Sequence, residues 1–204
     1  MLMSVTDMTY DRGVTRWQPD ARGRLQQAAI ELFAERGYER TTVAEIAQRA
    51  GLTERTFFRH FADKREVLFD GSETLQLAIT TAVAEAPPPA SPIEAVAAGL
   101  RAAGTMLPQR GPYAGLRQEI IAASEELQER EARKLLALSA AVADALRGRG
   151  VGEPAASLAA DAAISVFRVG FERWIAQDSR TFGEVLDESL EELRAVTAGA
   201  PVTS

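Results

Sequence analysis

The stretch that decides the fold is TTVAEIAQRAGLTERTFFRHFADK, residues 41–64. Thr42 followed by Glu45 is the pattern of a capping box, in which each side chain binds the backbone N–H of the other residue, so a short helix is expected to begin directly after Thr42. Gly51 is expected to end this helix and form the turn, and Thr53 to cap a second short helix. Two short helices joined by a glycine turn are the pattern of a helix-turn-helix.

The second short helix, ERTFFRHF at residues 54–61, has two different faces. Phe57 and Phe61 are four residues apart and share one face, which we expect to lie in the core. The side chains left to point elsewhere are those of Arg55, Thr56, Phe58 and Arg59. In a helix-turn-helix the second helix presents its outer face to the DNA major groove, where cations meet phosphates and base edges. The pattern therefore predicts a DNA-binding helix.

The overall charge of the chain at first argues against a nucleic-acid partner. The 204 residues carry 23 Lys and Arg against 29 Asp and Glu, a net charge of -6. Attraction to phosphates supplies most non-specific affinity for DNA, and an acidic protein lacks it. The first 70 residues, however, hold 11 of the basic and 11 of the acidic side chains, so the acidic excess lies in the remainder. A local basic patch in the first part can still bind DNA.

Apolar residues recur at helical spacing and alternating strand patterns are hard to find, which predicts an all-α protein. Helices are expected over residues 21–36, 43–50, 54–61 and 63–85, from Pro92 onward, once or twice within 113–148, and over 155–177 and 181–196. The expected organisation is a disordered arm at 1–20, a three-helix helix-turn-helix domain at 21–66, a helical ligand-binding and dimerisation domain at 67–198, and a tail at 199–204.

Residues 22–71 resemble the DNA-binding domain of the TetR family of bacterial transcriptional repressors. The resemblance is carried by AAIELFAERGYERTTVAEIA, by AGLTERTFFRHFADK and by EVLF, in which length, order, capping and spacing agree. It implies a homodimer that binds double-stranded DNA without metal or cofactor and represses until a small-molecule effector binds. One short recognition helix contacts few bases, so paired half-sites in an inverted-repeat operator are expected. An activator, or a DNA-binding protein of this fold without a ligand, is the alternative.

The resemblance also implies roles for individual side chains. It assigns contacts with backbone phosphates to Thr42, Thr53, His60 and Lys64. It assigns contacts with bases or the adjacent backbone to Arg55, Thr56 and Arg59. Phe58 stands where the family usually has tyrosine; the missing hydroxyl removes one hydrogen bond to a phosphate, but the ring can still pack on a sugar or a thymine methyl. Solvated charges at the arginines, and a cap alone at Thr42, are the simpler interpretations.

Large side chains in the middle of the C-terminal domain are candidates for a ligand cavity between helices, although core packing explains most such residues. The candidates are Met106, Tyr113, Leu116, Phe167, Arg168, Phe171 and Trp174. Few charges interrupt residues 93–107, so a cavity there is expected to take an apolar or amphipathic molecule. Arg168 would receive its carboxylate or hydroxyl, because a buried guanidinium needs a partner, and Arg117 and Glu119 are further polar candidates.

The last two expected helices carry an apolar stripe with small residues that permit close approach of helices. Its members are Ala163, Val166, Gly170, Leu186, Leu190 and Leu193. An exposed apolar stripe suggests a partner, and two such helices from each of two copies would form a four-helix bundle. We therefore expect these residues to form the interface of a homodimer.

Other classes of protein have less support. The chain has one histidine, His60, and no cysteine, serine elbow or carboxylate pair placed to work with it, so no enzymatic activity is expected. An all-helical enzyme with an incidental basic helix is the alternative. The Glu-rich run at 125–131 is expected to be a solvated face rather than a metal site. No apolar run approaches a signal peptide or the ~20 residues of a membrane span, which predicts a cytoplasmic protein without a membrane partner.

Overall fold

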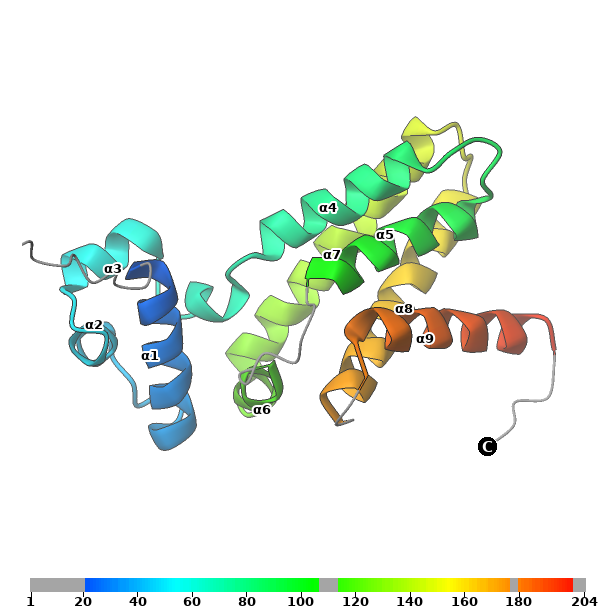
Figure 1. Cartoon of the computed structure of the whole chain (residues 1–204). Helices are drawn as coiled ribbons and strands as arrows, with labels where there is room; N and C mark the ends of the chain where they lie inside the picture. Colours follow the sequence, from blue (N-terminus) through cyan, green and yellow to red (C-terminus); the bar gives the residue numbers. More distant parts are fainter. Residues whose placement is uncertain (1–20, 107–113, 177–179, 200–204) are drawn as a thin grey trace, which may run out of the picture.

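The computed structural model describes residues 21–106, 114–176 and 180–199. These residues form helices joined by short loops, with no strand among them, which confirms the all-α prediction (Figure 1). The expected N-terminal arm at 1–20 and residues 200–204 of the expected tail lie outside the described residues.

The helices form two groups (Figure 1). The first group consists of α1 (Ala21–Arg36), α2 (Val43–Arg49), α3 (Glu54–His60) and a 3-10 turn, η1 (Glu66–Phe69). The second consists of α4 (Ser72–Glu85), α5 (Pro92–Met106), α7 (Glu125–Gly148), α8 (Ala155–Ala176) and α9 (Phe182–Thr197). The remaining helix, α6 (Ala114–Ala122), lies between the groups and packs on α1, α7 and α8.

The helix-turn-helix forms through the local contacts that its sequence predicts. Thr42 and Glu45 make the complete capping box at the start of α2, and the hydroxyl of Thr53 accepts the backbone N–H of Thr56 at the start of α3. Gly51 has a φ of 65°, in the left-handed region that glycine adopts at low cost. The predicted helices over 43–50 and 54–61 are thus confirmed to within one residue.

The core of the first group extends beyond its three helices. Leu25, Ile46 and Phe57 from α1, α2 and α3 are fully buried together with Val67 of η1. Ile120, Ile121 and Leu127, from α6 and the start of α7, belong to the same cluster. The packing of the N-terminal helices is therefore continuous with η1 and α6, so these segments attach the first group to the rest of the chain.

The single long helix expected over 63–85 is not formed. Asp63 accepts the backbone N–H groups of Arg65 and Glu66 at 2.8 and 3.2 Å, which favours a turn, and only η1 follows it. Gly71 then has a φ of 80°, which is incompatible with a continuous α-helix, and α4 begins at the next residue. The joint between the two groups is therefore a 3-10 turn followed by a left-handed glycine, not a helix that runs through both.

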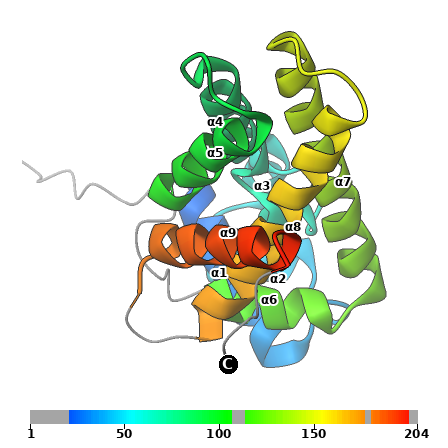
Figure 2. The ribbon, with the colours of Figure 1, turned by 90° about the vertical axis from the view of Figure 1, so that its right-hand side faces the viewer.

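The second group packs around a core of alanine, aliphatic and aromatic residues. Figure 2 shows α9 in front of α8, with α4 and α5 on one side and α7 on the other. Two glycines allow α9 to approach closely: a Cβ at Gly104 of α5 would lie 2.7 Å from the Cα of Gly183, and a Cβ at Gly170 of α8 would lie 2.9 Å from a methyl carbon of Leu186. The apolar face of α9 is thus covered by helices of its own chain.

This packing gives the expected dimer stripe a different partner. Ala163, Val166, Gly170, Leu186 and Leu190 are all buried, and Leu193 is half-buried against the same core. The stripe identified the apolar faces of α8 and α9 correctly, but these faces meet each other and α5 rather than solvent. In this arrangement the stripe offers little surface to a second copy.

Candidate nucleic-acid interface and junction cavity

The outer face of α3 is set by two buried rings on its inner face. Phe57 and Phe61 are buried, with ring centroids 5.5 Å apart, and fix the helix on the domain. Arg55, Phe58 and Arg59 consequently lie outside, and Phe58 leaves 55% of its surface exposed. An aromatic ring this exposed contributes little to folding, so it is available for contact with a partner.

Arg55 and Arg59 differ from most arginines of the first group in their partners. Four of those arginines bind carboxylates: Arg22 with Asp70, Arg36 with Glu45, Arg49 with Glu35, and Arg65 with Asp63. Within the described part of the chain Arg55 and Arg59 form no salt bridge, and the hydrogen-bond partner of Arg59 is Nε2 of His60, at 3.4 Å. Unpaired guanidinium groups beside an exposed ring are suited to phosphates and base edges.

The two capping threonines and His60 are further predicted phosphate contacts. The hydroxyl of Thr42 lies 2.8 Å from a carboxylate oxygen of Glu45, and that of Thr53 lies 3.0 Å from the hydroxyl of Thr56. Thr42 and Thr53 are exposed, whereas Thr56 and His60 are half-buried. The backbone N–H and then the hydroxyl of Thr42 lower the pKa of Glu45, so this carboxyl is ionised at neutral pH and the cap is complete.

Lys64 has a role that its sequence position did not reveal. Its Nζ donates to the backbone carbonyls of Tyr38, Thr41 and Glu39 at 2.8, 3.0 and 3.4 Å, and it lies 4.2 Å from the centroid of the Tyr38 ring. An ammonium has three N–H bonds. These contacts therefore occupy Lys64 in fastening the loop between α1 and α2, and a phosphate would have to compete with them.

A cavity of about 610 Å³ lies at the junction of the two groups, within the range usual for small-molecule sites. We call it the junction cavity. On one side it is lined by α1, η1 and the start of α4, and on the other by the end of α5 and by α6, α7 and α8. Its apolar lining includes Ile30, Leu75, Met106, Phe167, Phe171 and Trp174. Phe182 of α9 supports the last three, with ring centroids 5.1–5.9 Å from theirs.

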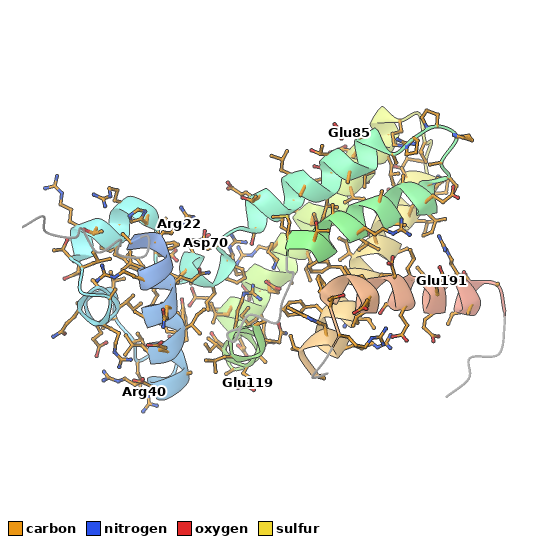
Figure 3. All side chains as sticks on the ribbon, in the orientation of Figure 1. Arg22, Arg40, Asp70, Glu85, Glu119 and Glu191 are labelled. Atoms are coloured by element: carbon orange, nitrogen blue, oxygen red, sulfur yellow. The ribbon has the colours of Figure 1, made fainter. Side chains whose placement is uncertain are left out.

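The other end of the junction cavity is charged. Glu131 accepts from Lys134 at 2.8 Å and from Nη2 of Arg117 at 3.1 Å, and each of the three side chains is no more than 20% exposed. Burial raises the pKa of Glu131, but Arg117 and Lys134 outweigh it and the net pKa is lowered. Burial, followed by Arg117, lowers the pKa of Lys134. Asp70, also in the lining, is bound by Arg22 at 2.9 Å (Figure 3).

Four of the seven predicted ligand-binding residues line this cavity: Met106, Phe167, Phe171 and Trp174. Leu116 instead packs against the core of the first group. Arg168 is exposed and pairs with Glu172 at 3.0 Å, because its position on α8 points it away from the buried aromatic residues. Glu119 is exposed, Arg117 lines the cavity, and Tyr113 lies outside the described residues.

The pattern of residues did not indicate that Glu131 and Lys134 belong to a cavity. Both belong to a charged stretch that resembles a solvated helix face, and their burial depends on η1 and α6 packing over α7. In the described residues no group of His, Cys, Asp or Glu could hold a metal ion. None of the described helices combines the length and apolarity required to span a bilayer.

Comparison with known proteins agrees with this geometry. Residues 25–70 match the N-terminal model of the bacterial regulatory proteins of the tetR family. Residues 90–198, more than half of the chain, match the MftR C-terminal domain, a C-terminal domain of the same family. The chain belongs to the tetR family.

Individual members of the tetR family match segments of different length in this chain. The transcriptional regulator TcmR of Streptomyces glaucescens is 34% identical over 135 residues, which span 57% of this chain and 59% of TcmR. The transcriptional activator FasR of Mycolicibacterium smegmatis is 39% identical over 56 residues, 28% of this chain and 26% of FasR. The chain thus spans less than two thirds of the curated relatives it matches.

Solved structures of the tetR family share the fold at low sequence identity. The transcriptional repressor FadR of Thermus thermophilus, crystallised with lauroyl-CoA, superposes with a TM-score of 0.51 at 24% identity, covering 90% of this chain and 96% of FadR.

Proposed function

We propose that this chain is a DNA-binding transcriptional regulator that acts as a homodimer on an inverted-repeat operator in the bacterial cytoplasm. The observation that carries the proposal is the outer face of α3, where Arg55 and Arg59 flank the exposed Phe58 and form no salt bridge with any other described residue. These are side chains that reach base edges and phosphates, whereas most other arginines of the domain are bound to carboxylates. Membership of the tetR family supports the same role.

We further propose that an apolar or amphipathic small molecule binds in the junction cavity and releases the operator, so that the protein represses in its absence. The cavity touches both groups of helices, and its aromatic end suits an apolar chain. The repressor FadR, which binds lauroyl-CoA, supports repression relieved by an amphipathic ligand. FasR is an activator and favours the alternative, in which this protein activates transcription. The ligand must bind the DNA-incompetent state better, since a molecule with equal affinity for both states shifts nothing.

The experiment that tests DNA binding is selection of bound sequences from random double-stranded DNA. Wild-type protein is expected to enrich one inverted repeat, and the double variant Arg55→Ala, Arg59→Ala is expected to enrich none. Leu77→Ala, which changes an exposed residue of α4, is the matched control and should recover the wild-type sequence. A wild-type protein that enriches no sequence would contradict the proposal, and would favour a protein of another class with an incidental basic helix.

The dimer requires a surface other than the buried stripe. The outer face of α8 carries Leu158, Ala162, Ser165 and Val169, which are exposed except for the half-buried Ala162. Their spacing of four, three and four residues is that of a coiled-coil seam, and we call them the outer seam of α8. Leu158 is 65% exposed and Val169 is 39% exposed, so an apolar strip remains uncovered in the single chain. We propose that two copies associate through this seam.

A further inference from the structure

The charged end of the junction cavity contains more positive than negative charge. Arg117 and Lys134 both bind the single carboxylate of Glu131. The nearby Arg130 is paired with Glu66 at 3.1 Å, so these two side chains together add no net charge. These ion pairs bring together three cations, Arg117, Arg130 and Lys134, and two carboxylates, Glu131 and Glu66, an excess of one positive charge. An excess cation with restricted access to water is stabilised by an additional anion, which the cavity has room to admit.

The same cations hold η1, the joint between the two groups of helices. The buried ring of Phe69 lies 4.8 Å from the Cζ of Arg130, 5.4 Å from the Cζ of Arg117 and 5.7 Å from the Nζ of Lys134. Nε of Arg117 also donates to the backbone carbonyl of Leu68 at 2.5 Å. Cations near an aromatic face are attracted to it, and charge-assisted hydrogen bonds are among the stronger ones. If Arg117 and Lys134 bind a different partner, their contacts with Phe69 and Leu68 of η1 therefore change as well.

We propose that the negatively charged group of an amphipathic ligand binds Arg117 and Lys134 in place of Glu131, and thereby loosens the hold of α6 and α7 on η1. This inference rests on the proposed ligand binding in the junction cavity and names its chemical class: an anionic head on an apolar chain. The chain lies against Phe171 and Trp174, and the head reaches the charged end. Glu131 acts as the internal competitor that occupies the two cations when the ligand is absent.

The test uses three probes with the same ten-carbon chain: decanoate, 1-decanol and decyltrimethylammonium, each below its aggregation concentration. Calorimetry on the full chain is expected to show decanoate bound roughly tenfold or more tightly than the other two, as expected for hydrogen bonds to a charged group. Lys134→Met should remove most of this preference and leave 1-decanol affinity unchanged, which also shows that the variant is folded. Arg168→Gln, an exposed cation of α8 outside the cavity, is the control.

Glu131→Gln is expected to change the affinity for decanoate in the direction opposite to Lys134→Met. Removing the internal competitor should increase decanoate affinity, whereas mere damage to the site would decrease affinity for every probe. Hydrogen exchange of the backbone amides at 66–71 should increase when decanoate binds wild-type protein. Equal affinity for the three probes, no decanoate binding, unchanged or weaker decanoate binding by Glu131→Gln, or unaltered exchange at 66–71 would each overturn the inference.

Measuring operator affinity on the same samples distinguishes this inference from the proposed function. Decanoate that binds with the expected charge dependence and loosens residues 66–71, but leaves affinity for the selected operator unchanged, supports the inference and contradicts ligand release. Operator release by 1-decanol with no dependence on probe charge supports ligand release and overturns the inference.

Discussion

At the scale of single residues, we expect Arg55 and Arg59 to contact DNA bases, because within the described chain neither forms a salt bridge with a carboxylate. Replacing either arginine by alanine should remove a bidentate contact, most favourably with guanine, and cost roughly 1–3 kcal/mol at one position of each half-site. The measurement is the affinity of each variant for a panel of single-base variants of the selected operator. If both variants kept the wild-type base preferences, this interpretation of the outer face would be wrong.

Lys64 is expected to behave differently, because its ammonium binds three backbone carbonyls. Lys64→Ala should weaken binding to all DNA sequences alike, and should also increase hydrogen exchange in residues 38–42, with a loss of roughly 1–3 kcal/mol in local stability. Arg40→Ala removes a nearby exposed cation that donates to one carbonyl, and serves as control. Exchange at 38–42 that matches wild type in Lys64→Ala would show that phosphate contact is its only role.

At the scale of one element, the start of α2 depends on the ionised carboxylate of Glu45. The pKa of Glu45 is lowered from 4.5 by Thr42, so the charged form is bound more favourably in the folded state. This contribution is present above the unfolded pKa and is lost as the pH falls through the folded one. The Tm difference between wild type and Glu45→Gln should therefore exist at neutral pH and vanish well below pH 4.5. Glu73→Gln, in the first turn of α4, which has no side-chain cap hydrogen bond, is the matched control.

The contact between α5 and α9 depends on the absence of side chains. In Gly104→Ala the new Cβ would lie 2.7 Å from the Cα and 3.2 Å from the N of Gly183, so backbone would have to move. We expect a loss of roughly 1–3 kcal/mol in the free energy of unfolding. Gly148→Ala, at the end of α7 with open space around it, should be neutral or stabilising by up to about 1 kcal/mol. Equal urea midpoints for the two variants would contradict the close approach.

At the scale of the whole molecule, we expect the outer seam of α8 to determine whether two recognition helices can bind one operator. Charges placed there should prevent association, so Leu158→Glu together with Val169→Glu is expected to give a monomer that loses specific DNA binding while remaining helical. The control is Leu77→Glu, which adds a charge at an equally exposed leucine on α4. Since α4 packs on α5 and α7 and does not carry the seam, this variant should remain a dimer. Light scattering at micromolar concentration measures the mass. A wild-type mass near 22.0 kDa would exclude the dimer.

The sequence by itself determined the features that depend on neighbours a few residues away. The capping box at Thr42, the glycine turn, the helical spacing and the two faces of α3 follow from local contacts, so most helices and the outward-facing residues of α3 could be predicted. Even the apolar faces of α8 and α9 were correctly identified. Periodicity, however, states which face is apolar and not what covers it, and the tertiary structure alone showed that these faces meet within one chain.

The tertiary structure likewise decided the features that join distant segments. The carbonyls around Lys64, the break at Gly71 and the charged end of the junction cavity depend on which helices pack together. Arg117 and Lys134 bind one carboxylate because α6 lies against α7, a contact that no spacing along the chain encodes. A charge on an isolated helix pattern is most often solvated, and only its surroundings in the folded chain make it part of a binding site.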